Sequence, residues 1–261
     1  MDICWKRSRD IWVRVLAWDI SDCGWDQPEN EDKVERLISG LSAQRQKKIR
    51  SMRQNKARMQ SLGAGLLLDH GLRHYGLRER DVRFAVGENG KPYLVDFPLL
   101  QFNLSHSGTM ILVVFAEAAG DFRKIAVGCD VERFGEPRYA VAKRFFAPEE
   151  QALLASCLSD REKQRMFYRI WTLKESYIKA TGDGMRMPLD KFDVRPEIDG
   201  MPAAIRQYEN KCSCKLKEYK LPGFCASACV LDYNMSEESE DNTRDNTGEI
   251  FFSFQKCTNV V

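Results

Sequence analysis

The sequence predicts an α+β protein, in which strands and helices alternate along the chain. Residues 11–18 alternate apolar and polar side chains, which is typical of a strand with one buried face. Residues 162–180 carry apolar side chains at helical spacing. Strands and helices follow in a similar order on both sides of Ala126, although no sequence repeat accompanies this order. Four further strands are expected late in the chain, at residues 192–194, 203–207, 213–219 and 224–231.

Length and composition fit one or two globular domains. The chain has 261 residues, of which 43% are hydrophobic and 30% charged. The net charge of +2 identifies no partner, and we expect neither nucleic acid nor a membrane as a partner. Charged residues interrupt the first 20 positions, so we expect no signal peptide, and no apolar run approaches membrane-span length. The nine cysteines include no C-x-x-C pair, which favours reduced thiols and a cytoplasmic location.

The helix predicted for residues 168–184 has a lysine where an ordinary amphipathic helix would not. Its apolar side chains fill an arc of about 160° around the helix axis. Lys174 falls in the middle of this arc, Glu175 lies on its edge, and Lys179 follows one turn later. In one interpretation, Lys174 extends its ammonium to the surface while Glu175 and Lys179 form a surface ion pair. In the other, Lys174 reaches a buried anion, either a substrate phosphate or a site carboxylate.

A second acidic element precedes this helix. The alternation in residues 125–131 predicts a strand, with Asp130 and Glu132 on its other face about 7 Å apart at their Cα atoms. Two neighbouring carboxylates repel each other, and a hard divalent cation would relieve the repulsion. Mg²⁺ typically binds one or two carboxylates together with substrate phosphates, and Glu175 could supply a third carboxylate. A charged edge strand without a ligand is the alternative.

Several short motifs occur in order along the chain. They are Gly90-Lys91-Pro92, Phe102-Asn-Leu-Ser-His-Ser107, Gly128-Cys-Asp-Val-Glu132, Phe145-Phe146 with Glu150, and Trp171-Thr-Leu-Lys-Glu-Ser-Tyr-Ile-Lys179. Taken together, these motifs resemble those of the Sfp-type 4′-phosphopantetheinyl transferases, over roughly residues 11–233.

The resemblance implies both a fold and an activity. The fold would be two similar subdomains that form a pseudo-dimer, with the active site between them. The enzyme would transfer the 4′-phosphopantetheine arm of coenzyme A to a serine of an apo acyl, peptidyl or aryl carrier protein, releasing adenosine 3′,5′-bisphosphate. Residues 1–126 would contribute to coenzyme A binding, and residues 127–234 would hold the metal site and the catalytic helix. An internal duplication of this kind favours a monomer.

The resemblance also implies roles for individual residues. Mg²⁺, or alternatively Mn²⁺, would be held by Asp130, Glu132 and Glu175. Either Glu175 or Glu150 would deprotonate the carrier serine, and Lys179 would stabilise the leaving phosphate or relay a proton. The side chains that would contact coenzyme A are those of Arg45, Lys48, Arg58, Lys91, Ser105, His106 and Lys174.

Residues 45–58 form a strongly basic run that contains no acidic residue. A solvated helix face, a nucleic-acid backbone and a phosphate-rich small molecule are all compatible with such a run. The resemblance implies coenzyme A phosphates, contacted by Arg45 and Lys48. The family often has an arginine before its next helix, whereas this chain has Gln60, and Arg58 about half a turn earlier could substitute.

Residues 235–261 lie outside the resemblance, and we predict an acidic, disordered tail there. Within this tail, residues 251–254 are either a last strand or a docking segment. Two other functions also fit the residues: another Mg²⁺-dependent phosphoryl-transfer enzyme or nuclease, and a non-catalytic carrier-binding module.

Overall fold

The computed structural model describes residues 10–118, 124–207, 212–233 and 249–261. Its helices and strands fall into two successive halves. The first half comprises, in order, β1 (Ile11–Asp19), α1 (Glu31–Ser39), α2 (Ala43–Ser51), α3 (Asn55–Leu72), β2 (Phe84–Val86), β3 (Pro92–Leu94), β4 (Gln101–Ser107) and β5 (Met110–Ala118). The second comprises β6 (Ile125–Arg133), α4 (Tyr139–Phe145), α5 (Pro148–Ala155), α6 (Asp160–Thr181), β7 (Phe192–Arg195), β8 (Ala204–Gln207), β9 (Ser213–Leu221) and β10 (Phe224–Asp232).

The two halves have the same topology. In the first, β1, β5 and β4 are hydrogen-bonded in that order, and in the second, β6, β10 and β9 are. In each half the first strand therefore lies at one side, the last strand in the middle and the preceding strand at the other side. Each half also has three α-helices after its first strand, followed by a small two-stranded pair, β2–β3 or β7–β8. This repeated order confirms the predicted α+β pseudo-dimer. The halves join between β5 and β6, so the predicted boundary at Ala126 lies just inside β6.

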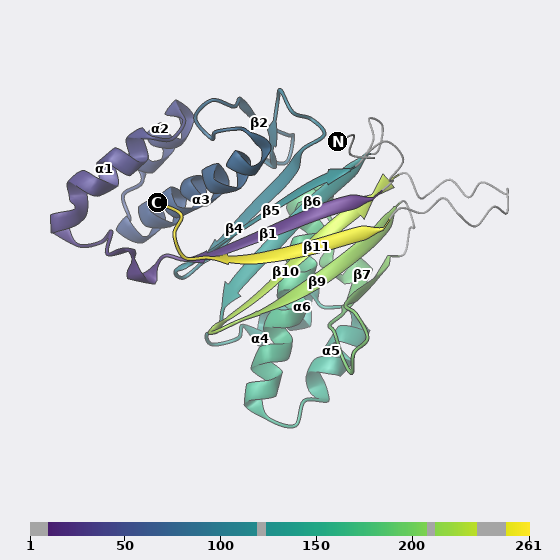
Figure 1. Ribbon diagram of the computed structural model, residues 1–261. Coiled ribbons are helices and arrows are strands. Elements are labelled where there is room, and N and C mark those ends of the chain that lie inside the picture. The colour runs from purple at the N-terminus through teal and green to yellow at the C-terminus, as the bar shows by residue number, and fades with distance from the viewer. Residues whose placement is uncertain (1–9, 119–123, 208–211, 234–248) are drawn as a thin grey trace, which may run out of the picture.

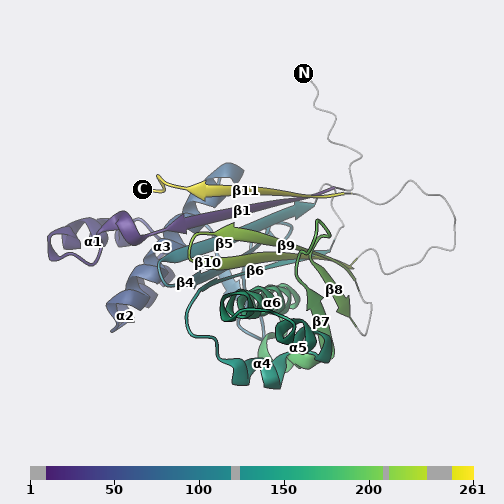
Figure 2. The ribbon, with the colours of Figure 1, turned by 90° about the horizontal axis from the view of Figure 1, so that it is seen from below.

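The molecule is built in four layers. The two sheets pack face to face through a core of β-branched and small side chains, among them Val15, Val114, Val127 and Ala226. Helix α3 covers the outer face of the first sheet, and α6 covers the outer face of the second. Figure 1 shows the two groups of helices on opposite sides of the strands. Figure 2 shows α6 nearly end-on, next to β6 and β10 and on the side away from β1 and β11. No helix in the described ranges is long and apolar enough to cross a membrane.

The end of the chain differs from the prediction of a disordered tail. Residues Ile250–Cys257 form β11, which pairs in parallel with β1 and extends the first sheet. Ile250 and Phe252 pack against the core between the sheets, and Phe251 stacks on Trp12 with ring centroids 4.7 Å apart. The prediction of a tail is therefore wrong for this segment. Of its two alternatives for residues 251–254, the structure has the strand (Figure 1). Residues 235–248, also predicted to be disordered, lie outside the described residues.

Candidate functional site

A close contact between β6 and α6 brings the two acidic elements together. An ideal Cβ placed on Gly128 would lie 2.1 Å from the carbonyl oxygen of Ser176 and 2.3 Å from the backbone nitrogen of Ala180. Only glycine therefore permits the strand to approach the backbone of the helix so closely. Helix α6 is positioned at its other end by Ser159, which forms a capping box with Glu162.

Asp130 is the most buried carboxylate of the resulting cluster, with 4% of its surface exposed. Its Oδ1 accepts hydrogen bonds from the ammonium of Lys179 at 2.6 Å and from the hydroxyl of Ser105 at 2.9 Å. Its Oδ2 is buried and has no hydrogen-bond partner among the described residues. A buried carboxylate oxygen without a partner is costly, so binding of a cation or a hydrogen-bond donor at this atom would be favourable.

The neighbouring carboxylates are electrostatically strained. Burial raises the pKa of Glu132, and the adjacent Asp130 raises it further. Burial and Asp130 likewise raise the pKa of Glu175. Burial alone would lower the pKa of Lys179, but the attraction of Asp130 outweighs it and the pKa lies above its usual value. The cluster therefore carries more negative charge than its one ammonium balances.

The donor chemistry of this cluster suits a hard cation, although its carboxylates are not gathered into a complete metal site. Carboxylate oxygens are the ligands that Mg²⁺ prefers in proteins. Within the part of the chain that the structure describes, no group of three or more His, Cys, Asp or Glu side chains is close enough to hold a metal ion. In this structure, Lys179 compensates Asp130 directly.

Two adjoining cavities, of about 240 and 260 Å³, extend away from the carboxylates. They share Gly90, Pro92 and Leu104 in their linings. The first cavity is bordered by Glu175 and Lys179, and the second by basic and apolar side chains, namely those of Arg45, Lys48, Phe84 and Phe102. The paired cavities thus connect the acidic cluster on one half to the basic helix α2 on the other.

Three of the side chains predicted to contact coenzyme A line the two adjoining cavities. Arg45 and Lys48 line the second cavity, and Arg45 Nε also donates to the buried Glu79 at 3.2 Å. The ammonium of Lys91 donates to the backbone oxygens of Val127 and Ala180, at 2.9 and 2.8 Å, while the residue borders the first cavity. Burial lowers the pKa of Lys91 to about 8. These three side chains therefore surround the connected cavities.

Three more of these predicted contacts have other surroundings. Ser105 donates its hydroxyl to Asp130 and so belongs to the acidic cluster. His106 is exposed at the next position of β4. Desolvation and then Lys179 lower its pKa, with a further contribution from Lys48. Arg58 is not among the lining residues of either cavity and lies 3.9 Å from Glu35 of α1.

Two predicted site residues are instead part of the interior. Lys174 Nζ lies 2.6 Å from Glu150 Oε1 and 2.8 Å from the backbone oxygen of Phe192. The side chains of Lys174 and Glu150 are 0% and 1% exposed. The expectation that Lys174 reaches a buried anion is confirmed, but the anion is Glu150. The roles predicted for Lys174 as a coenzyme contact and for Glu150 as a base are therefore corrected, because buried and mutually paired groups cannot touch substrate.

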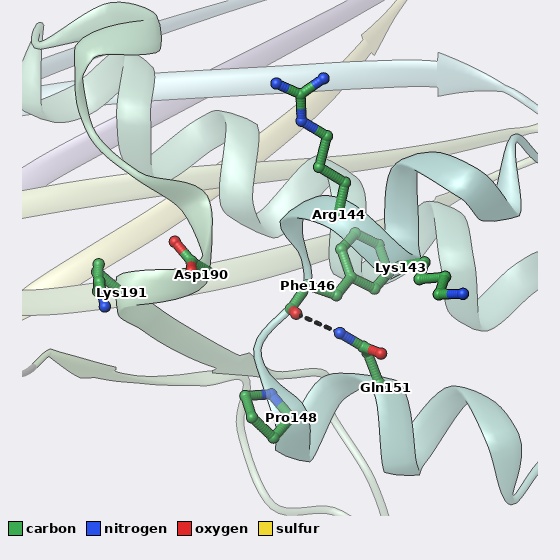
Figure 3. A pocket seen from close by; sticks show the side chains of 7 residues that line it. All are labelled: Lys143, Arg144, Phe146, Pro148, Gln151, Asp190 and Lys191. Carbon is green, nitrogen blue, oxygen red and sulfur yellow. Dashed lines mark hydrogen bonds between the residues drawn. The ribbon is translucent and has the colours of Figure 1, made fainter.

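A larger cavity, of about 570 Å³, lies elsewhere, between α4, α5 and the segment at Asp190–Lys191. Three of its lining residues are basic, Lys143, Arg144 and Lys191. Figure 3 shows that these side chains point in different directions rather than toward one another. The cavity therefore lacks a convergent set of donors, and we assign the functional site to the acidic cluster.

Sequence reasoning missed two contacts that polar side chains of β4 make with β6. Asn103 Oδ1 accepts from the backbone N–H of Cys129 at 3.1 Å, and Ser107 donates to Glu132 Oε2 at 2.8 Å. Both belong to the motif at residues 102–107. The alternation of a strand places them on the same face as Ser105, and this signal could have identified them.

Known proteins match the chain over the same elements. The family model of the 4′-phosphopantetheinyl transferase superfamily matches residues 126–229. The 4′-phosphopantetheinyl transferases ffp of Bacillus subtilis and Sfp of Bacillus subtilis strain 168 are 33% and 32% identical over 215 and 216 residues. Each alignment covers 82% of this chain and 92% of the relative. The chain therefore belongs to the 4′-phosphopantetheinyl transferase family and is a transferase.

Solved structures also match the chain, and one of them is matched over a smaller part of it. It is a holo-(acyl-carrier-protein) synthase from Bacillus anthracis in complex with CoA (3′,5′-ADP), with 16% identity and a TM-score of 0.37. The match covers 42% of this chain and 98% of that protein.

Proposed function

We propose that the protein transfers the 4′-phosphopantetheine arm of coenzyme A to a serine hydroxyl of an apo carrier protein. The serine oxygen forms a bond to the phosphorus on the pantetheine side of the pyrophosphate, and the bond to the adenosine-side phosphate breaks. Adenosine 3′,5′-bisphosphate leaves. Membership of the family supports this reaction. The observation that carries it here is Asp130, which has an unpartnered buried oxygen and pairs with Lys179 at the border of a cavity.

Coenzyme A would occupy the two adjoining cavities. Arg45 and Lys48 would contact its phosphates, since they are the basic residues that line the second cavity. Phe84 and Phe102 offer an apolar wall to the adenine or the pantetheine. Lys91 would contribute positive charge at the junction of the cavities. Ser105 and His106 would lie near the pyrophosphate, since Ser105 contacts Asp130. Arg58 and Lys174 would not contact coenzyme A, because Arg58 lines neither cavity and Lys174 pairs with Glu150.

Asp130, Glu132 and Glu175 would hold Mg²⁺, for which Mn²⁺ could substitute. When bound, the ion would neutralise charge on the pyrophosphate. Lys179 would stabilise the negative charge that develops on the leaving phosphate. Glu175 would accept the proton of the serine, directly or through water.

We also propose a cytoplasmic monomer. Both halves of one chain supply residues to the site, so a second copy is not required. Every cysteine in the described residues is a free thiol, which fits a reducing compartment.

Mass spectrometry tests the transfer directly. An apo carrier protein incubated with coenzyme A, Mg²⁺ and the enzyme should gain the mass of one phosphopantetheine arm. Asp130→Ala should fold, because it relieves repulsion within the cluster, and should lose at least about 100-fold in rate. An unmodified carrier with the wild-type enzyme, across acyl, peptidyl and aryl carriers, would contradict the proposed function. Full activity of Asp130→Ala would show that the metal is held elsewhere.

A further inference from the structure

Strands β4 and β6 lie at the edges of different sheets, and polar side chains join them. Three β4 side chains, each two residues apart, accept hydrogen bonds from backbone N–H groups of β6. The acceptors are Asn103, Ser105 and Ser107, and their donors are, in the same order, Cys129, Val131 and Arg133, at N···O distances of 3.1, 3.4 and 3.1 Å. Ser105 and Ser107 also donate their hydroxyls to Asp130 and Glu132, so this row fixes the position of the two carboxylates relative to the first half.

Ser107 has two partners that together fix the direction of its hydroxyl. Its Oγ accepts from the backbone N–H of Arg133 at 3.1 Å and donates to Glu132 Oε2 at 2.8 Å. A serine hydroxyl has one proton and two acceptor positions. Because the N–H of Arg133 occupies an acceptor position, the proton of Ser107 is left to point at Glu132.

The hydrogen bond from Ser107 gives the carboxylate of Glu132 a fixed partner on β4. Ser107 is itself held by the backbone N–H of Arg133, so Glu132 Oε2 is tied to the junction of the two strands. Ser105 makes the equivalent bond to Asp130, but its Oγ also accepts from Lys179 at 3.0 Å. Ser107 lines neither of the two adjoining cavities, so it is separate from the groups that would contact coenzyme A.

We propose that Ser107 is a positioning residue that holds Glu132 oriented toward a divalent cation. The inference rests on the proposed function, since it assumes the cation site at Asp130 and Glu132. Ser107 acts through Glu132 and the backbone of β6, so its loss weakens metal binding while coenzyme A binding is retained. Outer partners of metal ligands typically change metal affinity by about 10–100-fold when they are removed.

Titration of Mn²⁺ into the enzyme tests this role without turnover. Free Mn²⁺ is followed by electron paramagnetic resonance in the presence of coenzyme A and without carrier protein. Ser107→Ala should weaken Mn²⁺ binding by about 10-fold. Ser107→Thr keeps the hydroxyl and should restore binding to within about 3-fold of wild type. This means that at least about half of the free energy lost in the alanine variant is recovered. If the alanine variant is unstable, Ser107→Cys gives the same comparison, because a thiol is a weak donor.

Ser253→Ala is the matched control. Ser253 also lies on a strand and donates to a backbone oxygen, that of Val13, but it belongs to β11 on the far edge of the first sheet. Wild-type Mn²⁺ affinity in Ser107→Ala, or equal losses in Ser107→Ala and Ser253→Ala, would overturn the inference and leave the proposed transfer untouched. A wild-type enzyme that transfers the arm but binds no Mn²⁺ would overturn the inference together with the metal site. A wild-type enzyme that binds Mn²⁺ but modifies no carrier would instead refute the proposed function.

Discussion

Lys174 and Lys179 both lie on α6 and both form ion pairs. One pair is sealed in the interior, whereas the other is partly exposed at the border of a cavity. Lys174 and Glu150 meet at 2.6 Å with 0% and 1% of their side chains exposed. Lys179 and Asp130 also meet at 2.6 Å, but 28% of the Lys179 side chain is exposed. The first pair lies between α6, α5 and β7, and the second lies between α6 and β6 at the border of a cavity.

The two pairs differ most in how completely their groups are satisfied. Both oxygens of Glu150 accept hydrogen bonds, from Lys174 and from the backbone N–H groups of Val194 and Ala147. In the second pair, Oδ2 of Asp130 has no partner among the described residues. A closed, satisfied pair holds elements together, whereas an open, unsatisfied one can bind a ligand. Matched substitutions of the two lysines should therefore separate stability from activity.

Lys174→Met should produce the largest loss of stability. It leaves the carboxylate of Glu150 buried without its cation, which typically costs about 3–5 kcal/mol. The free energy of unfolding, measured with urea, should fall by this amount. The fraction that remains folded should transfer the arm at close to the wild-type rate. An exposed ion pair typically contributes up to about 1 kcal/mol. A smaller loss of unfolding free energy than this would contradict the view that the Lys174–Glu150 pair is buried and stabilising.

Lys179→Met should have the converse effects. The rate of transfer should fall by about 100-fold, as expected when one group that stabilises the developing charge is removed. The free energy of unfolding should fall by only about 1–2 kcal/mol, between the values for exposed and for fully buried pairs. Rate and urea midpoint measured for the same preparation give both numbers. A variant with normal activity and a large loss of stability would show that Lys179, like Lys174, is structural.

Lys91 sharpens the comparison, because its two hydrogen-bond acceptors are backbone oxygens rather than a carboxylate. Burial lowers its pKa from 10.5 to about 8. Between these values the unfolded state binds a proton that the folded state has released, so this lysine favours folding increasingly as the pH rises. The unfolding free energy of wild type relative to Lys91→Met should therefore increase between about pH 7.5 and 10, and other groups cancel in the difference. A difference that is flat with pH would mean that the lysine stays charged throughout.

Much of the site could be predicted from local patterns. The alternation in β6 placed Asp130 and Glu132 on one face, and the helical period in α6 placed Glu175 at the edge of the apolar arc. Both patterns depend only on the direction of side chains along a single strand or helix. This direction follows from the residue spacing in the sequence. The apolar arc also showed that Lys174 needed an anion, because an ammonium inside an apolar face is costly without one.

The partners of these side chains depended on the tertiary structure. Lys174 pairs with Glu150 of α5, and Lys179 pairs with Asp130, 49 residues away in the chain. The periodicity of a helix identifies its buried face but not the element that packs there, so it could not distinguish a structural lysine from one in the site. Strand β11 is a similar case, since its parallel partner β1 lies at the other end of the chain.

The sequence by itself therefore determined the two acidic elements, their family motifs and the α+β class, because these depend on order and local period. Only the tertiary structure decided which charges face the cavity and which are sealed inside. Gly128 is the physical reason for that division, because its missing side chain lets α6 approach β6 within backbone contact. At that distance Lys179 reaches Asp130 while Lys174, on another side of the same helix, is directed to Glu150.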